Sequence, residues 1–180
     1  MLSDNNKREL MKKLHGASHI TGKFVLRSGK TSNEYFDKYL FEADPHLLDR
    51  ICEFMLPLIP GETEVLAGLE LGGVPLATVL SGKSGITCAF VRKEAKDYGT
   101  CKLAEGAAID GKNVLVIEDV VTTGGQIIES VKELRKRGAK VDTVLCVILR
   151  EDSAVDRLAA EGLKLMPAFT MGEIKQAVAD

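Results

Sequence analysis

The spacing of apolar residues changes repeatedly along the chain, and this alternation predicts the fold. Four short segments are expected to be strands, namely residues 64–69, 86–91, 114–117 and 141–149. Residues 114–117 form an unbroken apolar run, which is typical of a parallel strand buried on both faces. Over residues 45–59 and 126–134, apolar residues recur three and four positions apart, as on one face of a helix. Strands that alternate with helices predict an α/β domain with a doubly wound, mainly parallel sheet and helices on both faces.

The expected helices begin and end at residues that favour helix termini. Asp44 and Pro45 open one helix, Gly138 stops another, and Thr170 with Glu173 makes a capping box for a short last helix. We therefore expect helices over residues 5–15 (ended by Gly16), 45–59, about 126 to 137, and 152–162, the last capped by Asp152, with a further strand over 164–169.

Residues 21–41 predict a hairpin. Short alternating pieces around Phe24 and over Tyr35–Tyr39 flank an SGKTS turn, which favours a strand, a turn and a second strand. Three cations lie near the turn, Arg27, Lys30 and Lys38. The residues alone leave two alternatives open, a solvated hairpin and a ligand-binding segment.

Residues 114–126, VLVIEDVVTTGGQ, carry the clearest chemical signal. Glu118 and Asp119 come at the carboxyl end of a buried strand, where open α/β sheets bind ligands. Residues 122–125 then lead into a helix at about Gln126, so backbone N–H groups, two hydroxyls and the positive helix end can face a phosphate. The order of residues fits neither a Walker A loop nor a GxGxxG turn.

The paired acids need an explanation of their own. Carboxylates repel a phosphate, but they accept hydrogen bonds from two vicinal hydroxyls. A ribose 5-phosphate fits this order, with its hydroxyls on Glu118 and Asp119 and its phosphate on residues 122–126. Acids at a solvated rim are the plain alternative, which explains the glycines but not the acid pair. If the acids are buried, they need partners.

The stretch resembles the phosphoribosyl pyrophosphate (PRPP) motif of type I phosphoribosyltransferases. Other segments resemble the orotate phosphoribosyltransferases of that family. Their hood pattern is matched by Phe24, Leu26, Ser28, Gly29, Ser32 and Tyr35. Residues 70–77, ELGGVPLA, correspond to the family's pyrophosphate loop, with Gly72 where many members have lysine.

Residues 92–112 form a long connection without adequate apolar periodicity, which in a compact domain is typical of a lid. A solvated charged loop is the alternative. The segment resembles the family's catalytic loop, whose pattern is matched by Arg92, Lys93, Glu94, Lys96 and Gly99. Tyr98 stands where the family has histidine, and with a pKa near 10 tyrosine cannot shuttle protons as imidazole does.

Arg150 ends the strand at 141–149, where its guanidinium can pair with a substrate carboxylate or form a rim salt bridge. Orotate carries such a carboxylate. The three histidines, His15, His19 and His46, lie outside these motifs and are expected to be structural or exposed.

The resemblance implies one domain over residues 1–180, with an N-terminal helix and hood over 1–41 and a mobile catalytic loop over 92–112. It implies transfer of ribose 5-phosphate from PRPP to orotate, giving orotidine 5'-monophosphate and pyrophosphate in pyrimidine (UMP) biosynthesis, with Mg²⁺ held through PRPP. It also implies a homodimer with shared active sites. A phosphoribosyltransferase for a purine base and a non-catalytic PRPP-sensing regulator are the alternatives.

The site residues that the resemblance implies fall into three groups. The catalytic residues are Lys96, Asp119 and Glu118. The PRPP-binding residues are Leu71, Gly72, Arg92, Lys93, Lys96, Tyr98, Glu118, Asp119, Val120, Val121, Thr122, Thr123, Gly124, Gly125 and Gln126. The orotate-binding residues are Thr122, Arg150, Arg27 and Tyr35.

Composition adds limits to this interpretation. The formal net charge of −2 gives no reason to expect nucleic-acid binding. No run approaches eighteen apolar residues and the first residues lack a signal-type apolar core, so we expect no membrane association and a cytoplasmic protein.

Overall fold

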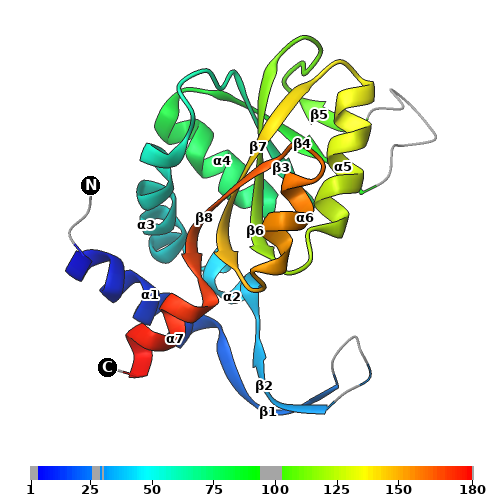
Figure 1. The fold of residues 1–180 in the computed structure, drawn as a ribbon. Helices are drawn as coiled ribbons and strands as arrows, with labels where there is room; N and C mark the ends of the chain where they lie inside the picture. The colour runs from blue at the N-terminus through cyan, green and yellow to red at the C-terminus, as the bar shows by residue number, and fades with distance from the viewer. Residues whose placement is uncertain (1–3, 26–28, 30, 94–102, 180) are drawn as a thin grey trace.

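A six-stranded sheet forms the centre of the computed structural model, which describes residues 4–25, 29, 31–93 and 103–179 (Figure 1). Its strand order is β5-β4-β3-β6-β7-β8, and all neighbours are parallel except the antiparallel pair β4 and β5. The strands are β3 Val65–Leu69, β4 Thr87–Val91, β5 Ala104–Gly106, β6 Asn113–Val121, β7 Lys140–Leu149 and β8 Lys164–Thr170. The expected mainly parallel sheet is confirmed.

Helices cover both faces of this sheet, as expected for a doubly wound domain (Figure 1). One face packs against α1 Asp4–Ser18, α3 Pro45–Met55, α4 Gly73–Ser84 and α7 Met171–Ala179, and the other against α5 Gly125–Lys136 and α6 Ser153–Ala159. Successive strand residues point to opposite faces. Leu115 and Ile117 therefore join the first core, and Val114 and Val116 join the second.

The hood is a two-stranded antiparallel hairpin of β1 His19–Val25 and β2 Thr31–Phe36, which projects from the sheet (Figure 1). The second strand is shorter than expected, because the chain turns into helix α2, Lys38–Ala43. The Asp37 carboxylate caps this helix by accepting a hydrogen bond from the Tyr39 N–H at 3.1 Å. The polar and aromatic alternation at residues 35–39 therefore spans a helix start.

Other boundaries also differ from the expectations, and α6 ends at Ala159 rather than at residue 162. Helix α1 continues through Gly16 to Ser18, and α3 ends at Met55, where a 3₁₀ turn, Leu56–Leu58, follows. Strand β6 does not end before its acids but runs through them, because it pairs with β7 as far as Val121 opposite Leu149.

Residues 103–112, expected in an open lid, belong partly to the sheet. Strand β5 pairs with β4, and Leu103 and Ile109 are buried. A three-residue strand is too short to leave a periodic apolar pattern. Residues 94–102, the centre of the expected lid, lie outside the described residues.

The last helix begins as its sequence predicts. The backbone N–H of Thr170 donates to the Glu173 carboxylate at 2.8 Å, and the N–H of Glu173 donates to the Thr170 hydroxyl at 3.1 Å. This reciprocal pair confirms the capping box. At α6, by contrast, Asp152 occupies the cap position without a side-chain capping bond.

Across the ranges that the structure describes, no helix has the length and apolar character needed to cross a membrane.

Candidate active site

The candidate site lies where neighbouring parallel strands end at one edge of the sheet. Strand β6 lies between β3 and β7, so the turns after these strands are adjacent. The backbone N–H of Arg150 donates to the Val121 carbonyl at 2.8 Å, which fixes the end of β7 beside the end of β6. The Glu70 carboxylate accepts the Lys93 N–H at 2.6 Å and so ties the turn after β3 to the end of β4.

Asp119 lies inside the protein rather than on a rim. Its side chain is 0% exposed, and Lys38 Nζ lies 2.5 Å from its Oδ2. Lys38 is the first residue of α2, so the cation comes from the junction between hood and sheet. The sequence motif did not identify this partner, because residues 38 and 119 are distant in the chain and nothing local to either indicates the pairing.

Two further carboxyl groups accompany Asp119. Burial, the hydrogen bond to Asp119 and its charge raise the pKa of Glu42 to about 9, so Glu42 is protonated at neutral pH. Burial, followed by the charge of Asp119, also raises the pKa of Glu118 well above its usual value. Burial acts to lower the pKa of Lys38, but the hydrogen bond and charge of Asp119 outweigh it and raise that pKa. The cluster therefore holds a lysinium–carboxylate pair beside a protonated Glu42, and beside Glu118, whose neutral form is favoured.

The turn between β6 and α5, in which the sequence analysis predicts a phosphate cradle, joins a strand to a helix start through two glycines. Gly124 has a φ of 73°, a left-handed conformation that glycine adopts without strain, and α5 begins at Gly125. Thr123 and Gln126 are exposed, and Thr122 is half-buried. One guanidinium nitrogen of Arg157 would lie 4.0 Å from a Cβ placed on Gly125. This arginine, which the sequence analysis did not single out, adds positive charge to the positive end of α5.

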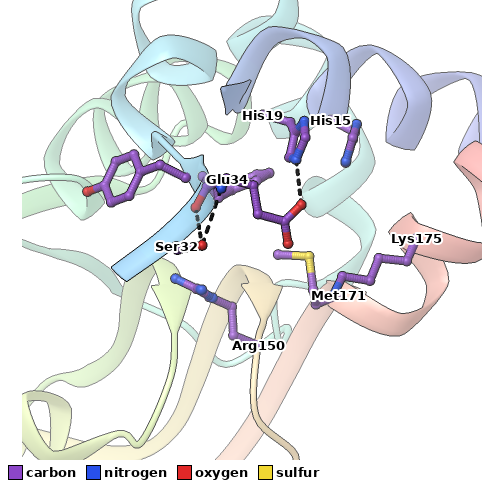
Figure 2. A pocket seen from close by; sticks show the side chains of 9 residues that line it. His15, His19, Ser32, Glu34, Arg150, Met171 and Lys175 are labelled. Carbon is purple, nitrogen blue, oxygen red and sulfur yellow. Dashed lines mark hydrogen bonds and ion pairs between the residues drawn. The ribbon is translucent and has the colours of Figure 1, made fainter. Parts of the chain in front are cut away.

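A cavity of about 160 Å³ opens between the hood, the end of β7 and helices α1 and α7 (Figure 2). It brings together two of the expected orotate ligands, Tyr35 and Arg150, and Thr122 does not line it. Figure 2 shows Arg150 extending from its strand toward Ser32 and Glu34 of the hood. The volume is below the roughly 300–1,000 Å³ of most ligand pockets, which suits a single small ring.

Two histidines expected to be merely structural or exposed line the same cavity. His15 and His19 stack with ring centroids 4.5 Å apart, and His19 Nε2 lies 2.9 Å from a Glu34 carboxylate oxygen. Burial, then the charge of His19, lowers the pKa of His15, while the hydrogen bond from His19 lowers the pKa of Glu34. Arg150 and Lys175 add two cations, so the lining favours an anion.

The remaining expected residues lie around this edge or outside the described ranges. Arg92 is half-buried and Lys93 exposed after β4, Leu71 is 62% exposed, and Gly72 is buried. Val120 and Val121 are the last two residues of β6. Arg27, Lys96 and Tyr98 lie outside the described residues.

The side chains that could act as metal ligands bear on the Mg²⁺ expected from the sequence. Among the residues that the structure describes, no three His, Cys, Asp or Glu side chains form a group suited to a metal ion. Mg²⁺ keeps several waters and often binds through substrate phosphates.

Comparison with known proteins agrees with this geometry. The phosphoribosyl transferase domain matches residues 46–178. An orotate phosphoribosyltransferase of Nocardioides sp. is 51% identical over 158 residues, which cover 88% of each chain.

Two solved structures extend the match to the fold. The orotate phosphoribosyltransferase of Mycobacterium tuberculosis, in complex with Fe(III) dicitrate, aligns with a TM-score of 0.85 at 30% identity, covering 94% of this chain and 98% of the other. The same enzyme in complex with PRPP aligns with a TM-score of 0.81 at 27% identity, covering 94% and 99%. The chain belongs to the phosphoribosyltransferase family and, within it, to the orotate phosphoribosyltransferases.

Proposed function

We propose that this chain transfers the ribose 5-phosphate group of PRPP to orotate, giving orotidine 5'-monophosphate and pyrophosphate in pyrimidine biosynthesis. The observation that carries the proposal is one sheet edge that holds a buried acid, a glycine turn at a helix start and a cationic cavity ending in Arg150. These features suit, in order, ribose hydroxyls, a phosphate and a small carboxylated ring. The cytoplasmic location stays a prediction from the sequence.

Each part of PRPP has a matching group in this arrangement. Asp119 and Glu118 accept hydrogen bonds from the ribose hydroxyls, and residues 122–126 bind the 5-phosphate through backbone N–H groups. The turn at Leu71 and Gly72 faces the pyrophosphate, together with Arg92 and Lys93 from the next strand. Arg150 pairs with the orotate carboxylate, and Tyr35 borders the ring.

The reaction replaces one bond at the ribose anomeric carbon. The bond to the pyrophosphate oxygen breaks with its electron pair, and an orotate ring nitrogen supplies the pair for the new bond. Because the nucleophile belongs to the substrate, the protein needs no strong base. Its contribution is to stabilise the departing anion and hold the sugar in line, and bound Mg²⁺ would neutralise part of the pyrophosphate charge.

The lid and the dimer complete the proposal. Lys96 and Tyr98, outside the described residues, are proposed to close over pyrophosphate from the neighbouring subunit of a homodimer. Inactive Lys96→Ala and Asp119→Asn proteins should then complement each other after subunit exchange, with about a quarter of all sites intact in a random mixture. No recovered activity despite demonstrated exchange would assign Lys96 to its own subunit's site.

A direct assay tests the function. Purified protein with PRPP and Mg²⁺ should consume orotate, as followed by its ultraviolet absorbance, and should leave uracil, adenine and hypoxanthine nearly unchanged. Consumption of a purine base instead would favour the purine alternative. Binding of PRPP without turnover of any base would favour the regulator.

A further inference from the structure

The pyrophosphate turn itself lacks a cation. Residues 70–75 read ELGGVP, with no lysine or arginine. A Cβ on Gly72 would lie 1.6 Å from Asp119 Oδ2 and 2.7 Å from Glu42 Oε1. With these acids in place, the position has no room for a side chain of any kind, so positive charge at this turn has to come from another element.

Lys38 supplies a cation at this place. Its Nζ reaches the same Asp119 oxygen, Oδ2, that a side chain on Gly72 would strike. The lysine side chain is 31% exposed while Asp119 is fully buried, so the ammonium lies at the open side of the pair. Its Nζ also lies 5.2 Å from the centre of the Tyr39 ring, which is a second favourable contact for the ammonium.

The charge balance changes when a sugar occupies the acid. In the unliganded protein, Lys38 compensates a buried carboxylate that would otherwise be strongly unfavourable. Ribose hydroxyls that bind Asp119 compete for its oxygen atoms with Lys38. A lysine has a flexible four-carbon stem, so its ammonium can move to a nearby anion without moving the backbone.

We propose that Lys38 is a PRPP-binding residue that pairs with Asp119 in the unliganded site and contacts the pyrophosphate beside Gly72 in the complex. This inference rests on the proposed function only in taking PRPP as the ligand. It assigns a substrate contact to the first residue of α2, an element for which the sequence analysis named no site residue.

Binding measurements with three ligands separate this role from a structural one. In Lys38→Met, the dissociation constants of PRPP and of pyrophosphate, each with Mg²⁺, should rise about tenfold or more, the usual loss for a charged hydrogen-bonded contact. Orotidine 5'-monophosphate, which has the ribose but no pyrophosphate, should bind within about twofold of the parent. Equal weakening of all three ligands would mean that Lys38 only holds Asp119, and the proposal would fail.

Lys83→Met is the matched control. Lys83 lies in the last turn of α4, at the end away from Gly73, is 23% exposed and pairs with Asp49 of α3 at 2.8 Å, so its loss should leave all three dissociation constants unchanged. Because Lys38→Met leaves a buried acid without its cation, a second comparison uses Asp119→Asn with and without Lys38→Gln. Pyrophosphate should bind to the single variant and about tenfold more weakly to the double variant. Equal binding to both would overturn the proposal.

The binding results remain separate from the test of the reaction. Lys38-dependent binding of pyrophosphate by a protein that fails to consume orotate would uphold this inference and reject the proposed function. If the parent protein consumes orotate normally but Lys38→Met binds PRPP as tightly as the parent, the proposed function stands and the inference about Lys38 is rejected.

Discussion

Helices α4 and α5 start at the same sheet edge, each at a glycine that follows another glycine, yet the turns before them differ in how much space surrounds their glycines. The turn at Gly72 and Gly73 is filled, because both residues are buried. The turn at Gly124 and Gly125 is more open, because Gly124 is buried but Gly125 is only half-buried at the start of α5.

The glycines therefore serve different needs. A Cβ on Gly73 would lie 2.3 Å from the Ile117 carbonyl oxygen, so this glycine is required by lack of space. Gly124 is required by its φ of 73°. On Gly125 a Cβ would have its nearest neighbours at 3.9 and 4.0 Å, so neither packing nor backbone conformation explains that glycine. The proposed phosphate, approaching the backbone at this turn, would explain it.

Gly73→Ala should break the filled turn and have the largest effect on stability. The added methyl meets backbone of β6, which cannot turn away as a side chain can. We expect a loss of about 3 kcal/mol of unfolding free energy, at the upper end for an overpacked core site. Urea unfolding followed by circular dichroism measures it. A loss below about 1 kcal/mol would show that α4 can shift away from β6.

Asp119→Asn tests the acid that packs against the filled turn. The kcat/KM for PRPP should fall at least about 100-fold, equivalent to about 2.7 kcal/mol, because the amide replaces a charged acceptor of ribose hydroxyls. The fold should persist, since Asn has the same shape and the partly exposed Lys38 can turn toward water. Native activity would contradict the ribose assignment, and loss of the folded state would favour a structural role.

Arg150→Ala extends the comparison to the next strand end, which opens on the cavity. The KM for orotate should rise about tenfold or more, as for one charged hydrogen-bonded contact, while the KM for PRPP changes less than about twofold. Arg137→Ala is the control, because Arg137 pairs with Glu133 at 2.7 Å near the far end of α5. Equal changes in both KM values would remove Arg150 from the orotate site.

The contrast between the turns also explains how far the sequence could predict the molecule. Apolar runs such as Val114–Ile117 predicted the sheet correctly, because burial on both faces leaves a local pattern. The predicted end of β6 was wrong, because Glu118 and Asp119 look like loop residues until their burial beside Lys38 is known. That pairing depends on where α2 packs, which no local pattern encodes.

The candidate site divides in the same way. The glycine turn before α5, the proposed phosphate cradle, follows from a short motif, and its backbone geometry is local. The cavity at Arg150 draws on α1, the hood and α7, so the positions of His15, His19 and Lys175 arise only from tertiary packing. Sequence reasoning could therefore propose candidate residues within one turn, but it could not identify side chains that come to this sheet edge from another element.

Gly125→Ala is the smallest change and isolates the open turn. The added methyl strains no backbone and meets no close atom, so unfolding free energy should stay the same or rise by up to about 1 kcal/mol, as for other unstrained Gly→Ala changes. A phosphate bound against the start of α5 would meet this methyl, so the KM for PRPP should rise several-fold while thermal stability is kept. Gly85→Ala at the far end of α4 is a useful contrast: it also has open space, but its φ of 76° predicts a loss of stability without a change in KM. An unchanged KM for PRPP in Gly125→Ala would mean that the phosphate does not lie against this turn, and the cradle would have to be sought elsewhere on the sheet edge.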